Sequence, residues 1–358
     1  MMKPLLYKPD LAAAAQRLEA WWENELVDRV CLQITAPRAD MPPEPQPQPR
    51  DLEQRWLDID YALLGLEHHM RHTYFGGEAL PIFMGNVGPD AFSAFLGAKV
   101  ELLPDTTWVR PLITDWDKMP SLELQQDGLW WQLQYNLLRR GQELGAGRWL
   151  VGFPDGHTGA DALSALRGRS ALCLDFYDSP QRVREAMLPI RTAGRQVYDA
   201  YFNLLQPEVQ GSSSGWAHAW GQGCCNVDQC DFLALISPRT FVDFFDEWLQ
   251  EEMSWFDRIV WHLDGPECLP HLDYLLSQPK IKAIQWVPGA GMPPQSQWIP
   301  LLKRIQAAGK GLWLGVESWE VEILTRELAS PGLMLITSVA SQTEADQMLR
   351  NVAKWTHA

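Results

Sequence analysis

A histidine and an aspartate stand two residues apart at the end of an apolar run, in the stretch FDRIVWHLDGPECLPHLDYLL over residues 256–276. The run is typical of a buried strand, and side chains two positions apart on a strand share one face. Ionisable groups buried there cost free energy unless something binds them or pairs with them. Imidazole and carboxylate groups bind Zn²⁺, and a carboxylate can also orient an imidazole for proton transfer. We therefore predict that His262 and Asp264 face a ligand cavity and bind a metal or move a proton.

Polar or aromatic side chains also follow the other apolar runs. Catalytic roles are predicted for the histidine and the acidic residues among them, which are Asp155, His157 and Glu317. Substrate contacts are predicted for a second set, which comprises Asn86, Trp216, Trp220, Asp231, Trp286 and Ser338. For a metal, the predicted ligands are His262, Asp264 and Glu317, with a cysteine as the alternative third ligand.

The six cysteines are expected to be mostly reduced, because their spacing fits no disulfide scaffold in so long a chain. The segment GQGCCNVDQCDF is interpreted as a loop whose thiols have no C-x-x-C spacing, so it gives little support to a structural zinc site. The segment VPGAGMPP has glycines but neither a Lys-Ser/Thr pair nor a full dinucleotide fingerprint. No phosphate cradle is predicted.

These side chains would converge only if their strands belong to one sheet. Eight buried-type strands are expected, near residues 30–36, 80–86, 149–154, 208–213, 258–263, 281–287, 312–316 and 333–337. Most of them alternate with helical segments, which favours an α/β fold. The expected form of this fold is a closed (β/α)8 TIM barrel, whose site lies where the strands end. A nine-stranded open sheet is the competing interpretation. The chain is expected to form one domain over residues 1–358, with an N-terminal helical cap over 1–29 and a β insertion over about 99–134.

Composition narrows the class of protein. The net charge of −15 without a basic stripe argues against nucleic-acid binding and against anionic membranes. No run of eighteen apolar residues occurs, and charges throughout the first thirty residues argue against a signal peptide or anchor, so a cytoplasmic location is expected. Eighteen tryptophans indicate either a large aromatic core or an aromatic-lined pocket for a flat or sugar-like ligand.

Three segments carry a family resemblance: VGFPDGHTGADALSALRGRSALCLDFYDSPQRVREAM, CDFLALISPRTFVDFF and WHLDGPECLPHLDYLLSQPKIKAIQWVPGAG. They resemble the uroporphyrinogen decarboxylase superfamily, which also contains zinc-dependent methyltransferases that serve corrinoid proteins and coenzyme M. The resemblance covers about residues 149–350, extends more loosely back to residue 30, and is nearest to an uncharacterised decarboxylase-like branch. It implies a (β/α)8 barrel.

The chain departs from both well-studied enzyme types of this superfamily. Decarboxylases carry an Arg-rich stretch after the first strand, whereas ITAPRADMPP leaves only Arg38, so uroporphyrinogen decarboxylation is not expected. The methyltransferases carry His-x-Cys where this chain has His262 and Asp264, and another Cys where it has TSVAS. Only His262 carries over. Oxygen ligands in place of thiolates make a harder site that can still hold zinc.

The resemblance favours a methyltransferase-like enzyme with a metal- or acid/base-assisted site, a small-molecule substrate, zinc and a corrinoid protein partner. One alternative is a carbohydrate- or glycoside-acting enzyme that uses Asp155, Asp264 and Glu317, with stacking on Trp216, Trp220 and Trp286. The others are a non-catalytic ligand-binding barrel and a decarboxylase of a smaller acid. A homodimer is one assembly that the sequence leaves open.

Overall fold

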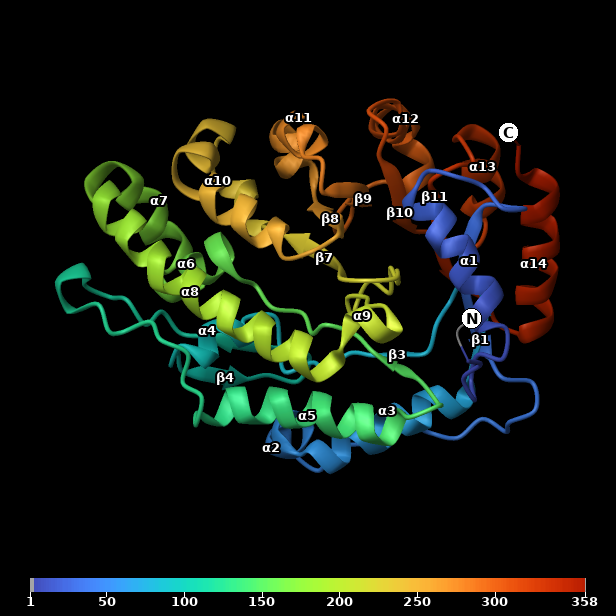
Figure 1. The fold of residues 1–358 in the computed structure, drawn as a ribbon, viewed down its shortest axis with the longest axis horizontal. Helices are drawn as coiled ribbons and strands as arrows, with labels where there is room; N and C mark the ends of the chain where they lie inside the picture. Colours follow the sequence, from blue (N-terminus) through green and yellow to red (C-terminus); the bar gives the residue numbers. More distant parts are fainter. Residues whose placement is uncertain (1–2, 358) are drawn as a thin grey trace.

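The computed structural model of the protein describes residues 3–357. The centre of the molecule is a seven-stranded sheet (Figure 1). The strand order is β2-β1-β11-β10-β9-β8-β7. All neighbours are parallel except β1 and β2. The strands are β1 (Cys31–Pro37), β2 (Thr73–Gly77), β7 (Cys225–Gln229), β8 (Arg258–Asp264), β9 (Ile281–Val287), β10 (Gly311–Gly315) and β11 (Leu333–Ser338).

Helices surround this sheet. In Figure 1, α10 to α14 lie along the outer side of strands β7 to β11, and α5 and α8 cover the opposite part of the molecule. The longer helices are α1 (Leu11–Trp22), α3 (Ile59–His72), α5 (Leu129–Gly145), α6 (Gly159–Arg167), α7 (Arg169–Asp178), α8 (Pro180–Leu205), α10 (Pro238–Ser254), α12 (Ile299–Ala307), α13 (Glu320–Glu327) and α14 (Gln342–Trp355). The shorter ones are α2 (Leu52–Leu57), α4 (Ala91–Phe95), α9 (Pro207–Gln210) and α11 (Leu272–Ser277).

Two apolar cores lie on the two faces of the sheet. The larger one packs the outer face of the sheet against the helices and includes Ile259, Trp261 and Leu263 of β8. The smaller one includes Val260 of β8, together with side chains of α1 and of the loop before β7. We call the face of this smaller core the inner face. Because strand side chains alternate, the inner face of β8 carries Val260, then His262, then Asp264.

Two short strands continue the sheet pattern on the far side of the molecule. Strand β3 (Ile82–Phe83) pairs in parallel with β6 (Leu150–Val151). Beyond β6, Phe153 bridges in parallel to Ser214, and the hydroxyl of Ser212 donates to the carbonyl of Cys225 in β7 over 2.9 Å. Within residues 3–357, the fold is therefore a mixed α/β structure with a central parallel sheet, and closure into a barrel is not shown.

The structure corrects one of the eight expected strands. Of residues 208–213, expected as a strand, the first three belong to helix α9, which starts at Pro207 after Gln206 in a left-handed conformation. In the remainder, Ser212 forms only an isolated antiparallel bridge to Gly221. The strand of this region is instead β7, within the segment interpreted as a cysteine-containing loop. Two of its buried side chains, Asn226 and Asp228, are polar. Asn226 donates to the hydroxyl of Tyr198 over 3.3 Å.

The segment over residues 99–134 is strand only in its first part. Strands β4 (Val100–Leu102) and β5 (Thr107–Val109) form an antiparallel hairpin. The second part, expected as β structure around an Asp-Gly turn, becomes helical at Leu129, with Gly128 as the N-cap. The reason is packing: Trp131, on the buried face of α5, lies 5.4 Å from Phe95 and 5.8 Å from Tyr201 by ring centroids.

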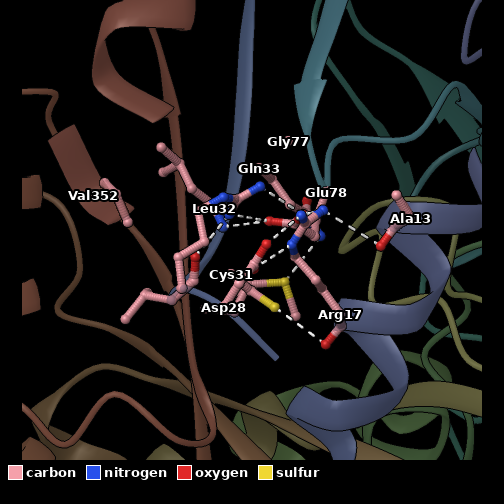
Figure 2. Close-up of polar contacts among 12 residues, drawn as sticks. Ala13, Arg17, Asp28, Cys31, Leu32, Gln33, Gly77, Glu78 and Val352 are labelled. Carbon is pink, nitrogen blue, oxygen red and sulfur yellow. Dashed lines mark hydrogen bonds and ion pairs between the residues drawn. The ribbon is translucent and has the colours of Figure 1, made fainter. Parts of the chain in front are cut away.

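A buried carboxylate ties the N-terminal helix to the first strands. Glu78 is fully buried and accepts hydrogen bonds from two guanidinium nitrogens of Arg29 at 2.7 and 2.8 Å, and from the backbone N–H of Leu32 at 2.8 Å. Figure 2 shows Arg17 of α1 reaching towards the same carboxylate, and their side chains lie 3.5 Å apart. This network holds α1 against the beginning of β1.

Among the described residues, no helix combines the length and the apolar character that crossing a bilayer requires.

Candidate functional site

Three ionisable side chains from two neighbouring strands meet at the inner face. His262 and Asp264 belong to β8, and Asp231 follows β7 at the start of a 3-10 helix (Asp231–Leu235). One ligand atom from each, an imidazole nitrogen and two carboxylate oxygens, lies within 4.8 Å of the other two. Neighbouring parallel strands end at the same edge of the sheet, which explains why residues 31 positions apart converge. We call Asp231, His262 and Asp264 the acidic-histidine trio.

The imidazole of His262 is oriented by its neighbour on β9. Gln285 lies directly opposite His262 in the strand register, and its Oε1 atom lies 2.7 Å from Nδ1 of His262. A carbonyl oxygen only accepts hydrogen bonds, so Nδ1 carries the proton and Nε2 keeps a free lone pair. The ring system of Trp216 lies at nearly a right angle to the imidazole, with a centroid distance of 5.0 Å and an interplanar angle of 89°. In the neutral imidazole, this bond leaves Nε2 as the nitrogen that can bind a metal, since the bond to Gln285 occupies Nδ1.

Asp231 is positioned through its backbone by a buried carboxylate. The N–H groups of Asp231 and Phe232 donate to the two oxygens of Asp161 over 2.9 and 2.8 Å. Asp161 lies in α6 and is almost completely buried. Burial raises the pKa of Asp161, while His157 and the two N–H donors oppose that shift. The contact fixes the beginning of the Asp231–Leu235 turn relative to α6.

His157 is a buried cation beside the trio. Its Nδ1 lies 3.5 Å from Oδ1 of Asp90, and its Nε2 lies 4.0 Å from Oδ2 of Asp231. Burial lowers the pKa of an imidazole, but the hydrogen bond to Asp90 and the charges of Asp161, Asp155 and Asp231 outweigh burial and raise the pKa of His157 to about 9. At neutral pH, His157 is therefore protonated and offsets part of the negative charge of the site.

Asp155 lies next to His157 and is bound by the other register neighbour of His262. Gln229 of β7 pairs with His262 in the strand register, and its Nε2 donates to Oδ1 of Asp155 over 2.8 Å. Burial raises the pKa of Asp155, although His157, Gln229 and His262 oppose this shift. Burial also raises the pKa of Asp264, helped by Asp231 and Glu267 and opposed by His262. Raised pKa values make both carboxylates better proton acceptors than exposed ones.

The structure does not bring Glu317 into the trio. It follows β10, is exposed, and uses its backbone N–H to bond the carboxylate of Glu320 at 3.1 Å. None of the three potential metal-ligand groups within residues 3–357 contains it. The side chain that joins His262 and Asp264 in a potential metal-ligand group is that of Asp231, which the sequence assigned to substrate binding.

Two of the three predicted stacking tryptophans lie away from the acidic-histidine trio. Trp286 belongs to the outer core, where its ring packs against Trp298 at 5.0 Å, because it alternates with the inward-facing Gln285. Trp220 is buried in the smaller core and donates to the carbonyl of Gln210. Only Trp216 contacts the trio, so the aromatic wall expected for a carbohydrate is not assembled.

Two predicted substrate contacts lie elsewhere. The side chain of Asn86 accepts a hydrogen bond from the backbone N–H of Gly88 over 2.8 Å and so forms a local turn. Ser338 ends β11 and lines a separate cavity of about 590 Å³ with Thr35, at the carboxyl ends of β11 and β1.

Sequence reasoning missed three residues that support the site, namely Asp90, Asp161 and Gln229. For Asp161 a signal existed: an acidic residue within the small-residue and apolar helix GADALSALR has to be paired if that helix is buried. The pairing partner could not be predicted, because it is the backbone of residues 231 and 232.

The cysteines are all free, as expected. Cys268 lies close enough to the trio for Asp231 and Asp264 to add to burial, and together they raise the pKa of its thiol to about 12. The group of ligand atoms that lie within 4.8 Å of one another does not include this thiol, so the donor set at this position is one nitrogen and two carboxylates.

No protein-family model and no curated protein match the chain. Among solved structures it is similar to a methyltransferase from Methanosarcina mazei, with a TM-score of 0.60 and 12% sequence identity over 95% of this chain and 98% of that chain. The homocysteine methyltransferase MmuM from Escherichia coli, in its apo form, aligns over 50% of this chain and 88% of that chain, at 9% identity and a TM-score of 0.22, too low for an argument. At such low identity, the first likeness shows a shared α/β fold along nearly the whole chain.

Proposed function

We propose that this protein is a methyltransferase-like enzyme of the uroporphyrinogen decarboxylase superfamily, with a divalent metal held by Asp231, His262 and Asp264. The observation that carries the proposal is the convergence of these three ligand atoms within 4.8 Å, with Nε2 of His262 left free by the bond to Gln285. The fold likeness to a methyltransferase is consistent with it. The links from β3 through β6 and residues 212–214 to β7 support a closed barrel as the full architecture.

The donor set fits a metal of the zinc class. One imidazole and two carboxylates are ligands that Zn²⁺ accepts, and three protein ligands leave a position for a substrate. A second layer is present, because Gln285 holds the imidazole and Asp161 holds the backbone of Asp231. When bound, such a metal would act as a Lewis acid that lowers the pKa of a thiol or water bound to it.

Residues of the chain would supply the base, the charge balance and the packing that such a reaction needs. Methyl transfer to a protic acceptor breaks the bond between the methyl carbon and the donor atom, which leaves with the electron pair. The same step forms a bond from the methyl carbon to the acceptor atom and releases the acceptor proton, which a base has to take. Asp155 is the suited base outside the trio, because burial raises the pKa of its carboxyl group. His157, protonated and beside Asp231, stabilises the carboxylates against mutual repulsion. Trp216 closes one side of the imidazole to water.

Metal analysis of variants tests the proposal. Purified protein reconstituted with zinc should lose one equivalent in His262→Ala, Asp231→Asn and Asp264→Asn. Glu317→Gln is the matched control, since this carboxylate lies outside the trio, and it should retain full zinc. Zinc content that falls in Glu317→Gln, or that is unchanged in His262→Ala, would overturn the assignment of ligands.

The reaction class needs its own assay. Methylcobalamin serves as the probe for a corrinoid methyl donor, with a small thiol as acceptor and the cobalamin absorption spectrum as the readout. Demethylation that requires zinc and is lost in His262→Ala supports methyl transfer and a corrinoid protein partner. If zinc binds at the trio but no methyl donor reacts, the metal site stands and the methyltransferase proposal fails.

A further inference from the structure

Two histidines lie one above the other at the end of helix α3. His68 and His72 are four residues apart, which places them on the same face of the helix, and their rings stack at a centroid distance of 4.2 Å and an interplanar angle of 27°. The Nδ1 atom of His72 lies 2.7 Å from the carbonyl oxygen of His68. Because that oxygen only accepts, the proton of His72 sits on Nδ1 and its Nε2 is free to bind a metal.

Three ring nitrogens of this pair make no hydrogen bond to the described protein. Both ring nitrogens of His68 and Nε2 of His72 are shielded from solvent and make no hydrogen bond in the described structure. A ring nitrogen that is shielded from solvent and makes no hydrogen bond is unfavourable, so such an arrangement is unusual unless a ligand completes it.

A carboxylate from another segment completes the group. Glu44 belongs to the proline-rich segment before α2, and its Oε2 lies 3.7 Å from Nε2 of His72. One ligand atom from each of Glu44, His68 and His72 lies within 4.8 Å of the other two. The segment is held against α3 by Tyr61, whose hydroxyl donates to the carbonyl of Pro47 over 3.0 Å. The placement of Glu44 is therefore supported by a contact that does not involve the histidines.

We propose that Glu44, His68 and His72 form a second metal site, for a divalent ion of the zinc class. Two imidazoles and one carboxylate suit Zn²⁺ or Co²⁺, and a three-residue set leaves a coordination position open. All three residues line the cavity of about 590 Å³ that also includes Thr35 and Ser338 at the strand ends. The open position therefore faces a cavity large enough for a small organic ligand with an oxygen or nitrogen donor.

This proposal does not rest on the proposed function, because the two metal sites share no residue. The experiment is a Co²⁺ titration followed by visible absorption, in the full-length chain carrying His262→Ala so that the trio does not contribute. One equivalent should bind in this background. Binding should weaken by more than about tenfold when His72→Ala or Glu44→Gln is added, since a ligand is lost. Glu44 is on an exposed segment, so its variant keeps the helix intact even if the histidine variants fold poorly.

His69→Ala is the matched control. His69 lies between the two ligands in sequence and lines the same cavity, but it is outside the group of three. It should bind Co²⁺ as the His262→Ala parent does. The proposal is overturned if the parent binds no Co²⁺, if Glu44→Gln binds as tightly as the parent, or if His69→Ala weakens binding as much as His72→Ala.

Discussion

His262 and Gln285 lie opposite each other on adjacent parallel strands, and a single 2.7 Å contact between Nδ1 and Oε1 sets the direction of the imidazole. The residue on the other side of His262 in the register, Gln229, is also a glutamine but bonds Asp155 instead. Two glutamines thus flank the histidine, and only one acts on its ring. This difference makes the orienting role of Gln285 testable.

Gln285→Leu should weaken zinc binding at the trio by roughly 10- to 100-fold, because the imidazole loses the acceptor that fixes its tautomer and orientation. Competition with a chromophoric chelator measures the affinity. Gln229→Leu has the same change of side chain next to the same histidine and should leave zinc affinity close to that of the wild type. Equal weakening in both variants would show that packing, and not the bond to Nδ1, matters.

Gly159→Ala should destabilise the protein by roughly 2–4 kcal/mol through overpacking and backbone strain. Gly159 starts α6 with a φ of +54°, and a Cβ there would come within 1.9 Å of the ring of Trp248. Urea denaturation measures the free energy of unfolding. Gly156→Ala is the control, because a Cβ at this nearby position meets no atom within 4 Å. A loss of similar size in both variants would contradict the close approach of α6 to α10.

Glu252→Gln should make stability less dependent on pH. Glu252 is buried and accepts hydrogen bonds from Thr158 and Trp248, yet burial outweighs these bonds and raises its pKa from 4.5 to about 7. The folded state therefore holds this proton more tightly than the unfolded state. The resulting stabilisation is complete below pH 4.5 and is lost as the pH rises to about 7, a change on the order of 3 kcal/mol.

Chemical denaturation at several values between pH 4.5 and 8 measures this contribution. The stability of wild type should fall with rising pH relative to that of Glu252→Gln, since glutamine does not ionise. Glu247→Gln, an exposed change on the same helix, should follow the wild-type curve. Parallel curves for wild type and Glu252→Gln would show that Glu252 ionises in the folded protein as readily as in the unfolded one.

Glu78→Gln should cost about 3–5 kcal/mol of stability, because Arg29 would keep a buried charge without its counter-charge. Urea denaturation again provides the measurement. Asp28→Asn removes a half-exposed carboxylate from the same network, where Asp28 pairs with Arg17. That pair is open to solvent, so its loss should cost less than about 1 kcal/mol. If Glu78→Gln lowers the free energy of unfolding as little as Asp28→Asn does, the buried charge of Glu78 does not stabilise this network.

Local sequence pattern determined much of the sheet. Apolar runs that alternate with helical segments predicted strands at β1, β3, β6, β8, β9, β10 and β11. The period of two also placed His262 and Asp264 on one face, since this follows from strand geometry alone. Strand β7 was missed because two of its buried residues, Asn226 and Asp228, are polar. The partner of the Asn226 side chain is the hydroxyl of Tyr198 in α8, a tertiary contact that local pattern does not reveal.

The third member of the trio was decided by tertiary structure. Sequence pattern shows that a polar residue follows a strand, but not which strand ends are adjacent. Asp231 reaches His262 because β7 pairs with β8, whereas Glu317 follows β10, which does not pair with β8. Strand pairing also determined the side of the sheet on which Trp286 lies. Gln285 is the residue opposite His262, so Trp286 points to the outer core. The sequence of a strand determines which of its side chains share a face, because successive side chains point to opposite faces. Which side chains of different strands meet is determined by the pairing of the strands in the tertiary structure.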